Sequence, residues 1–286
     1  MIKYREVLTK ISVHPLFWVI IVIGIFTARF KELLLLFCIV LIHELGHAFA
    51  AAHYNWRIKK IQLLPFGGVA ELEEHGNKSL KEELVVVIAG PIQHIWMMAV
   101  GYIVFEVGWL GADLYYFFIW NNIIILAFNL LPIWPLDGGK VLFNVLSYRF
   151  PYLQAHEKMM KLSCVFFSVI LVWQLLWNSN NIMMWVLLIF LAVSLYQEWK
   201  QKQYAFMRFL LERYYGNKRG IEKIAPIEVQ SEDRLYTIFT KFRRGYKHSI
   251  IVHGKYKEHY TLDENELLYA YFTEKRTTSS VEELIG

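Results

Sequence analysis

The sequence predicts an α-helical polytopic membrane protein of about six transmembrane helices, followed by a small C-terminal α/β domain. Three observations support this fold class. Of the 286 residues, 56% are hydrophobic and 19% are charged, whereas a soluble domain usually carries about 25% charged residues. The apolar residues gather in blocks of roughly 20, the length that crosses a bilayer as a helix. From about Lys200 onward the chain is polar and mixed in charge.

These patterns divide the chain into three predicted parts. Residues 1–199 form a transmembrane domain, residues 200–220 a linker or interfacial helix, and residues 221–286 a cytoplasmic domain. The two cysteines, Cys38 and Cys164, lie in apolar segments, so we expect small buried side chains and no disulfide framework or cysteine zinc site. The net charge of +5 is spread over loops and tail. It indicates basic loops on the cytoplasmic side of a membrane and no nucleic-acid binding.

Six segments are predicted to span the bilayer. They are Ile11–Ala28, Glu32–His53, Leu84–Phe105, Leu114–Leu131, Leu162–Trp177 and Ile182–Trp199. Lysine and arginine concentrate at the N-terminus and after the second and fourth spans, whereas the loops on the opposite side carry only Arg29 and Lys31. Because basic loops stay in the cytoplasm, both termini are predicted to face it.

The segment Arg57–Glu74 is apolar in its middle but too short for a helical span. Pro65 and the pair Gly67-Gly68 favour a hairpin or re-entrant loop. A hairpin can offer a strand edge to an extended substrate. A cytoplasmic surface loop is the alternative that the pattern leaves open.

Residues 43–47 read H-E-L-G-H and lie inside the apolar stretch Leu33–Ala52. On a helix, His43 and His47 share one face, so both imidazoles can hold one metal ion. Glu44 lies beside them, where it can act as the base for an attacking water. Charged and polar groups at bilayer depth are costly and usually functional. The motif therefore predicts a metalloprotease working inside a membrane.

A catalytic zinc site needs a third protein ligand and one open position. Asp137 is the favoured candidate, because Pro132 and Pro135 end the fourth span and an acidic group there can be aimed into the helix bundle. His94 in the third span is the rival ligand, although a lone helical histidine is more often a hydrogen-bonded packing residue. The second and fourth spans run in the same direction, so His47 and Asp137 are both expected in the cytoplasmic half of the membrane.

Four motifs together resemble the site-2 protease family of intramembrane zinc metalloproteases. They are Ile42–His47, Pro65–Gly68, Ala89–Pro91 and Asn129–Gly139. The resemblance covers roughly Ile11 to Trp199. It implies one Zn²⁺ per chain, bound by His43, His47 and Asp137, with Glu44 as the general base.

The resemblance also implies a substrate-binding region that contains Asn129, Pro135, Phe66 and Gly67, with the Asn engaging substrate backbone. One departure from the family pattern is His94, which stands where the family often has Asn. This histidine is therefore a possible substitute for the Asn in an oxyanion or substrate role.

The tail from Ile221 has the pattern of a small α/β module. We predict a strand at Ile227–Val229, a helix capped by Ser231, a second strand at His248–Val252 and a helix at Asp263–Arg276. This order resembles a single cystathionine-β-synthase (CBS) domain. The resemblance implies pairing between chains, hence a homo-oligomer, and ATP as a possible ligand. A purely structural or dimerising module is the alternative.

A six-span core joined to a CBS domain resembles the site-2 proteases that act in sporulation. That resemblance implies cleavage of a membrane-associated inactive pro-sigma factor, control by inhibitory membrane proteins, and residence in the membrane around the forespore. Two other classes are considered. A CBS-regulated transporter or channel would use the intramembrane charges as an ion path. A prenyl-protein protease would usually have Glu as its third ligand, whereas this chain offers Asp137.

Overall fold

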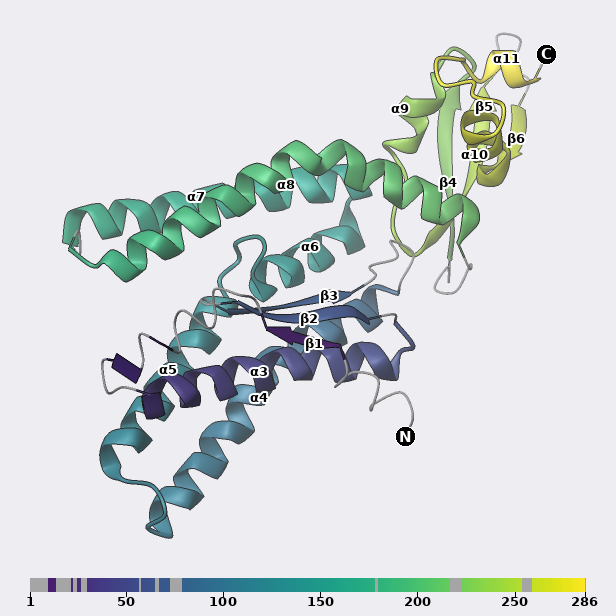
Figure 1. Ribbon diagram of the computed structural model, residues 1–286. Coiled ribbons are helices and arrows are strands. Elements are labelled where there is room, and N and C mark those ends of the chain that lie inside the picture. The colour runs from purple at the N-terminus through teal and green to yellow at the C-terminus, as the bar shows by residue number, and fades with distance from the viewer. Residues whose placement is uncertain are drawn as a thin grey trace. The chain divides into compact units, whose positions relative to one another are not determined.

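A computed structural model describes residues 10–13, 22, 25–26, 30–56, 58–64, 67–72, 79–177, 180–216, 223–253 and 259–285. Figure 1 shows its helices and strands. The helices are α3 (Phe30–His53), α4 (Leu80–Glu106), α5 (Ala112–Asn129), α6 (Asp137–Arg149), α7 (Tyr152–Trp177), α8 (Ile182–Tyr215), α9 (Leu235–Phe239), α10 (Glu264–Phe272) and α11 (Glu282–Ile285). The strands are β1 (Ile11–Val13), β2 (Ile58–Leu64), β3 (Gly67–Leu72), β4 (Lys223–Gln230), β5 (Tyr246–His253) and β6 (His259–Asp263).

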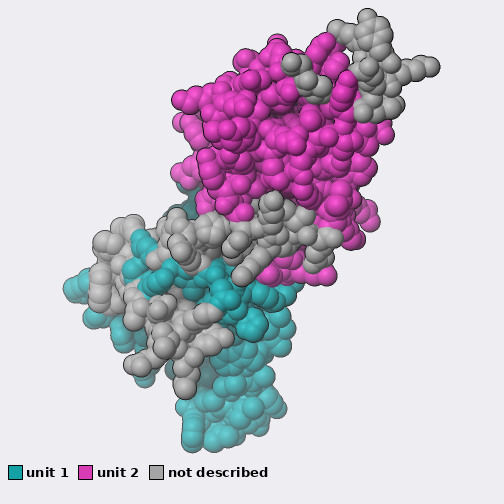
Figure 2. Space-filling model, turned by 90° about the vertical axis from the view of Figure 1, so that its right-hand side faces the viewer, with its two compact units in different colours: residues 1–74, 84–141, 166–191 teal, residues 75–83, 142–165, 192–286 magenta. Residues whose placement is uncertain are grey.

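The chain divides into two compact units, coloured separately in Figure 2. The first unit comprises residues 1–74, 84–141 and 166–191, and the second comprises residues 75–83, 142–165 and 192–286. Long helices contribute residues to both units.

Among the described residues, four helices are long and apolar enough to cross a membrane: α3, α4, α7 and α8. They correspond to the second, third, fifth and sixth predicted spans. The fourth predicted span is helix α5, but Asn121, Asn122 and Asn129 lower its hydropathy and it falls outside this group. The first predicted span is wrong at its beginning, because Ile11–Val13 form a strand. Most of its remaining residues lie outside the described part of the chain.

In the first unit, α3 packs against α5 and against a small sheet with the order β1-β2-β3. Strands β2 and β3 form an antiparallel hairpin in which Leu64 pairs with Gly67, and β1 pairs with β2 in parallel. Figure 1 shows this sheet lying along α3. The hairpin predicted within Arg57–Glu74 is therefore present. Its turn, Pro65 and Phe66, lies outside the described residues.

In the second unit, a sheet with the order β4-β5-β6 pairs β4 with β5 in parallel and β5 with β6 in antiparallel fashion. Its buried core includes Ile250 and Leu267 from the sheet and α10, and Phe206, Phe209 and Leu210 from the end of α8. Residues 200–215, predicted to begin a linker, are thus the last part of a continuous helix. Its apolar side chains are buried in this core, which fixes the helix end to the sheet.

The predicted cap of the helix after β4 is wrong. Helix α9 begins after Arg234, whose side chain makes no capping bond, and not after Ser231. The helix predicted at Asp263–Arg276 is shorter, and Asp263 is its N-cap, where the carboxylate accepts a hydrogen bond from the Asn265 amide. This is the usual role of Asp at a helix start.

Candidate metal centre

Helix α3 places His43, Glu44 and His47 in the interior of the first unit. All three side chains are buried, at 3%, 7% and 7% exposure. Spaced four residues apart, the two histidines lie one turn apart on the same helix face. The other residues of this helix are mostly apolar. Packing of neighbouring elements against α3 therefore buries the three polar side chains.

Asp137 is the first residue of α6, and a tight turn from α5 holds it. The turn is closed by hydrogen bonds from the Leu136 amide to the Ile133 carbonyl (2.9 Å) and from the Lys140 amide to the Leu136 carbonyl (3.1 Å). A Cβ at Gly138 would lie 2.2 Å from the Leu130 carbonyl oxygen. Only glycine allows this close approach of backbone segments. The two glycines that follow the aspartate therefore let α5 and α6 meet tightly enough to point a buried carboxylate inward.

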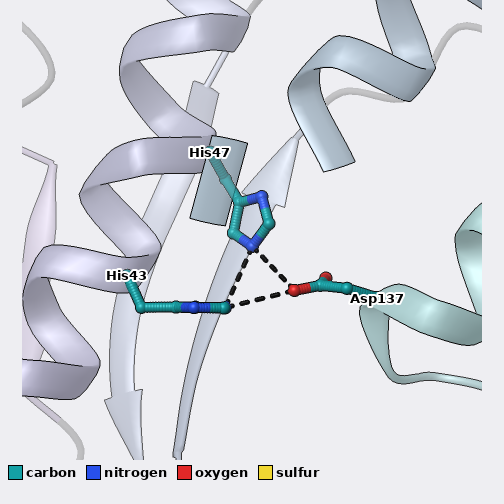
Figure 3. Close-up of side chains that lie close together, drawn as sticks. All are labelled: His43, His47 and Asp137. Carbon is teal, nitrogen blue, oxygen red and sulfur yellow. Dashed lines mark hydrogen bonds and ion pairs between the residues drawn. The ribbon is translucent and has the colours of Figure 1, made fainter. Parts of the chain in front are cut away.

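The three side chains meet at their ligand atoms, as Figure 3 shows. The Nε2 atoms of His43 and His47 are 3.1 Å apart. Each lies 3.2 Å from Oδ2 of Asp137. Ligand atoms about 2.0–2.1 Å from a tetrahedral zinc ion lie roughly 3.3 Å from one another. The spacing of this triangle thus suits one shared metal ion.

The hydrogen bond that a histidine makes through Nδ1 determines whether its Nε2 carries a proton or a lone pair. His47 Nδ1 lies 2.8 Å from the main-chain carbonyl oxygen of Val86. A carbonyl can only accept, so Nδ1 carries the proton and the Nε2 of His47 presents a lone pair. Among the described residues, no group donates a hydrogen bond to Asp137 Oδ2, although this atom is buried. A carboxylate oxygen facing imidazole lone pairs calls for a cation between them, so this donor set fits zinc.

The matches to known proteins agree with this geometry. The model of Peptidase family M50 matches residues 31–111 and 107–171. Stage IV sporulation protein FB of Bacillus subtilis (strain 168) is 48% identical over 283 residues, which is 99% of this chain and 98% of that protein. This chain belongs to peptidase family M50.

Two further matches to this M50 peptidase come from Methanocaldococcus jannaschii. A zinc metalloprotease of Methanocaldococcus jannaschii is 38% identical over 125 residues, 43% of this chain and 36% of that protein. The solved structure of the site-2 protease from Methanocaldococcus jannaschii is 32% identical with a TM-score of 0.53, covering 66% of this chain and 89% of that one. The predicted resemblance to site-2 proteases and the predicted class of enzyme, a zinc metallopeptidase, are confirmed. A transporter or channel finds no support in these matches.

The other predicted site residues of this M50 peptidase occupy several places. Asn129 is the last residue of α5, and Pro135 is half-buried in the turn before Asp137. Gly67 begins β3, while Phe66 lies outside the described residues. His94, the rival metal ligand, lies behind His43 and not in the group of three that converges on one point.

Two contributors to the centre were given no role in the sequence analysis, although Gly90 belongs to the Ala89–Pro91 motif. Gly90 of α4 faces the ring of His47, since a Cβ there would lie 2.2 Å from its Nε2. Asn122 of α5 is fully buried and contacts His94. An amide inside an apolar helix is costly enough to have signalled Asn122. The Ala89–Pro91 motif marks Gly90, but nothing in the sequence shows that this glycine makes room for the ring of His47.

Proposed function

We propose that this M50 peptidase cleaves a membrane-associated protein near the cytoplasmic side of the membrane, and that its substrate is an inactive pro-sigma factor during sporulation. The observation that carries the peptidase site is the triangle of His43, His47 and Asp137 with Glu44 on the same buried helix. The 48% identity to a stage IV sporulation protein over 99% of this chain supports a role in sporulation.

We assign the metal ligands as Nε2 of His43, Nε2 of His47 and Oδ2 of Asp137. When bound, zinc supplies Lewis-acid polarisation of a peptide carbonyl and makes water nucleophilic near neutral pH. Glu44 accepts the proton that the attacking water loses and delivers it to the amide nitrogen of the leaving group. The new C–O bond thereby replaces the C–N bond, and Glu44 returns to its starting carboxylate.

The hairpin is the proposed docking edge for the substrate. In the sheet order β1-β2-β3, β1 and β3 are the outer strands among the described residues, and β3 is the one in the hairpin. An outer strand can pair with an extended peptide through main-chain hydrogen bonds. We assign Gly67 on this strand, Phe66 before it, Asn129 at the end of α5 and Pro135 in the turn before Asp137 to substrate binding.

The proposed topology places both termini in the cytoplasm and the enzyme in the membrane around the forespore. The excess of lysine and arginine at the N-terminus and after the second and fourth predicted spans supports the orientation. Inhibitory membrane proteins are the proposed regulators. The resemblance to sporulation proteases supports both the location and the regulators.

For the C-terminal part, we propose a CBS domain over residues 221–286 that follows the transmembrane domain (1–199) and a connecting segment (200–220). The order β4-α9-β5-β6-α10 supports it. A single copy favours pairing between chains, and ATP is the proposed ligand. If ATP changes neither the cleavage rate nor the thermal stability of the purified protein, regulation by this nucleotide is wrong.

The substrate assignment is tested by reconstituting the purified protein in liposomes with a pro-sigma factor and sequencing the N-terminus of the product. The expected result is one zinc-dependent cleavage, absent with Glu44→Gln. An unrelated membrane protein of similar size serves as the control substrate. Cleavage of the control with no cleavage of the precursor would disprove the substrate while leaving the peptidase intact.

A further inference from the structure

Behind the metal centre, a line of buried polar side chains leads away from His43. His43 Nδ1 lies 3.1 Å from Nε2 of His94 on α4. His94 Nδ1 lies 2.9 Å from Oδ1 of Asn122 on α5. Both His94 and Asn122 are fully buried, at 0% exposure. Polar groups so deep in an apolar unit are retained only when each is hydrogen-bonded.

Asn122, the residue farthest from the metal centre, determines which atom donates and which accepts in each hydrogen bond of this line. The side-chain amide nitrogen of Asn122 donates to the main-chain carbonyl of Phe118 (2.9 Å). This bond orients the amide so that Oδ1 faces His94, where it can only accept. His94 must therefore carry its proton on Nδ1 and present a lone pair at Nε2.

The same reasoning extends to the metal ligand. Because Nε2 of His94 is an acceptor, Nδ1 of His43 is the donor across the 3.1 Å contact. His43 then presents a lone pair at Nε2, the atom that faces Asp137. His47 reaches the same state in one step through the Val86 carbonyl. Both histidines are thus protonated on Nδ1. A side chain accepts this proton's hydrogen bond at His43, and a main-chain carbonyl accepts it at His47.

We propose that His94 and Asn122 are positioning residues that hold His43 in its Nδ1-protonated form, and thereby set the metal affinity of the site. Both ring nitrogens of His94 are engaged in this line, so His94 is not itself a metal ligand. Partners of metal-bound histidines fix the ring and its tautomer, and their loss typically weakens metal binding about 10–100-fold. The inference rests on the proposed metal site at His43, His47 and Asp137.

The test compares pairs of variants that differ in hydrogen-bonding capacity. His94→Leu removes the acceptor for His43, whereas His94→Gln places an amide oxygen near the former Nε2 position. Asn122→Leu removes the acceptor for His94, whereas Asn122→Asp keeps it. Met97→Leu, a buried change on the same helix that preserves side-chain volume, is the matched control. Zinc affinity is measured by competition with a chromophoric chelator on the full-length protein in detergent.

Both leucine variants should bind zinc about 10–100-fold more weakly than wild type, while His94→Gln, Asn122→Asp and Met97→Leu stay within about threefold. Circular dichroism of each variant checks folding, and the Gln and Asp variants keep the test decisive if a leucine variant does not fold. Affinity equally weak in His94→Gln and His94→Leu would overturn the proposal, as would unchanged affinity in both leucine variants. Wild-type protein that binds no zinc would instead refute the metal site itself.

Discussion

Two buried groups of histidine and carboxylate side chains in this chain differ in how the carboxylate is neutralised. In the first unit, Asp137 Oδ2 faces the Nε2 atoms of His43 and His47. In the second unit, Glu264 Oε2 accepts hydrogen bonds from the Arg213 guanidinium (2.7 Å) and the His248 amide (2.8 Å). Both groups are shielded from water, so each carboxylate needs a partner.

The second group supplies its own cation. Arg213 also donates to the main-chain carbonyl of Arg243 (3.1 Å), and the Arg243 amide lies 3.2 Å from Nε2 of His248. The imidazole therefore accepts at Nε2 and turns its Nδ1 toward Glu264, at 3.3 Å. In the first group, Lys140 is 3.8 Å from the other oxygen of Asp137 and leaves Oδ2 to the imidazoles. Histidine and carboxylate side chains thus form an ion pair where a guanidinium is present, and a candidate metal site where imidazole lone pairs face the carboxylate.

The largest expected effect is the loss of metal on removing Asp137. Asp137→Ala leaves two neutral imidazoles, so zinc binding and proteolysis should be lost together. Lys140→Gln is the matched control, because the lysine charge faces Oδ1 of Asp137 and not the Oδ2 that lies near both imidazoles, and this variant should retain zinc. Zinc content by atomic absorption and a cleavage assay check both variants. One zinc ion per chain in Asp137→Ala would show that this carboxylate is not a metal ligand, and the contrast with Glu264 would fail.

Glu44→Gln should abolish most of the cleavage activity while leaving zinc binding unchanged. The amide cannot take the proton from water, so cleavage should fall by about 10²–10⁴-fold, the usual share of a general base. Zinc content should equal that of wild type, since the ligand triangle is intact. Single-turnover cleavage with zinc analysis on the same preparation measures both. A variant that lost zinc as well would show that Glu44 maintains the site and does not serve only in proton transfer.

Arg213→Met should destabilise the second unit without changing zinc content. Removing one partner of a buried ion pair leaves the other charge uncompensated, which costs about 3–5 kcal/mol. Arg208→Met is the control on the same helix, since its pair with Glu212 is exposed on the arginine side and worth about 0–1 kcal/mol. Hydrogen exchange of the β5 and α10 amides reports the opening free energy. Equal protection in the two variants would contradict the assigned role.

The smallest expected effect is a dependence of the second unit's stability on pH. Burial lowers the pKa of His248 below its ordinary value of 6.5, despite the hydrogen bond to Glu264. Burial alone would raise the pKa of Glu264, but the hydrogen bond from His248 and the charge of Arg213 hold it below 4.5. For both groups the unfolded chain binds more protons, so stability is complete above pH 6.5 and falls as the pH drops.

The loss should begin below pH 6.5 through His248 and deepen below pH 4.5 through Glu264. Thermal melting of the second unit across this range is the measurement, and His248→Gln should flatten only the upper part. The first unit's metal ligands offer no matched control at these pH values, because proton and metal compete for the same lone pairs. A melting curve independent of pH between 4 and 7 is the contrary result.

The convergence of His43, His47 and Asp137 was the most predictable part of the candidate metal centre. The spacing of four residues predicts that His43 and His47 share one helix face. Asp137 is recognisable as an acidic residue at the end of an apolar segment. Pro65 and the glycine pair favoured a hairpin or re-entrant loop, and a surface loop stayed open until the β2–β3 pairing decided for the hairpin. Local chemistry determined each of these features.

What could not be predicted depends on contacts between distant segments. The line from His43 through His94 to Asn122 joins three helices, and nothing near any one residue reveals its partners. Arg213 reads as part of a basic linker, yet it is buried because α8 continues into the core around Phe209. The first predicted span failed at Ile11–Val13, because pairing with β2 outweighs the apolar pattern that favoured a helix.

The turn that holds Asp137 has a consequence for the order in which the protein is made. His43 and His47 leave the ribosome long before Asp137 does, so α3 is synthesised while its third ligand does not yet exist. The nascent chain therefore cannot form the triangle of His43, His47 and Asp137 until the turn into α6 has been translated.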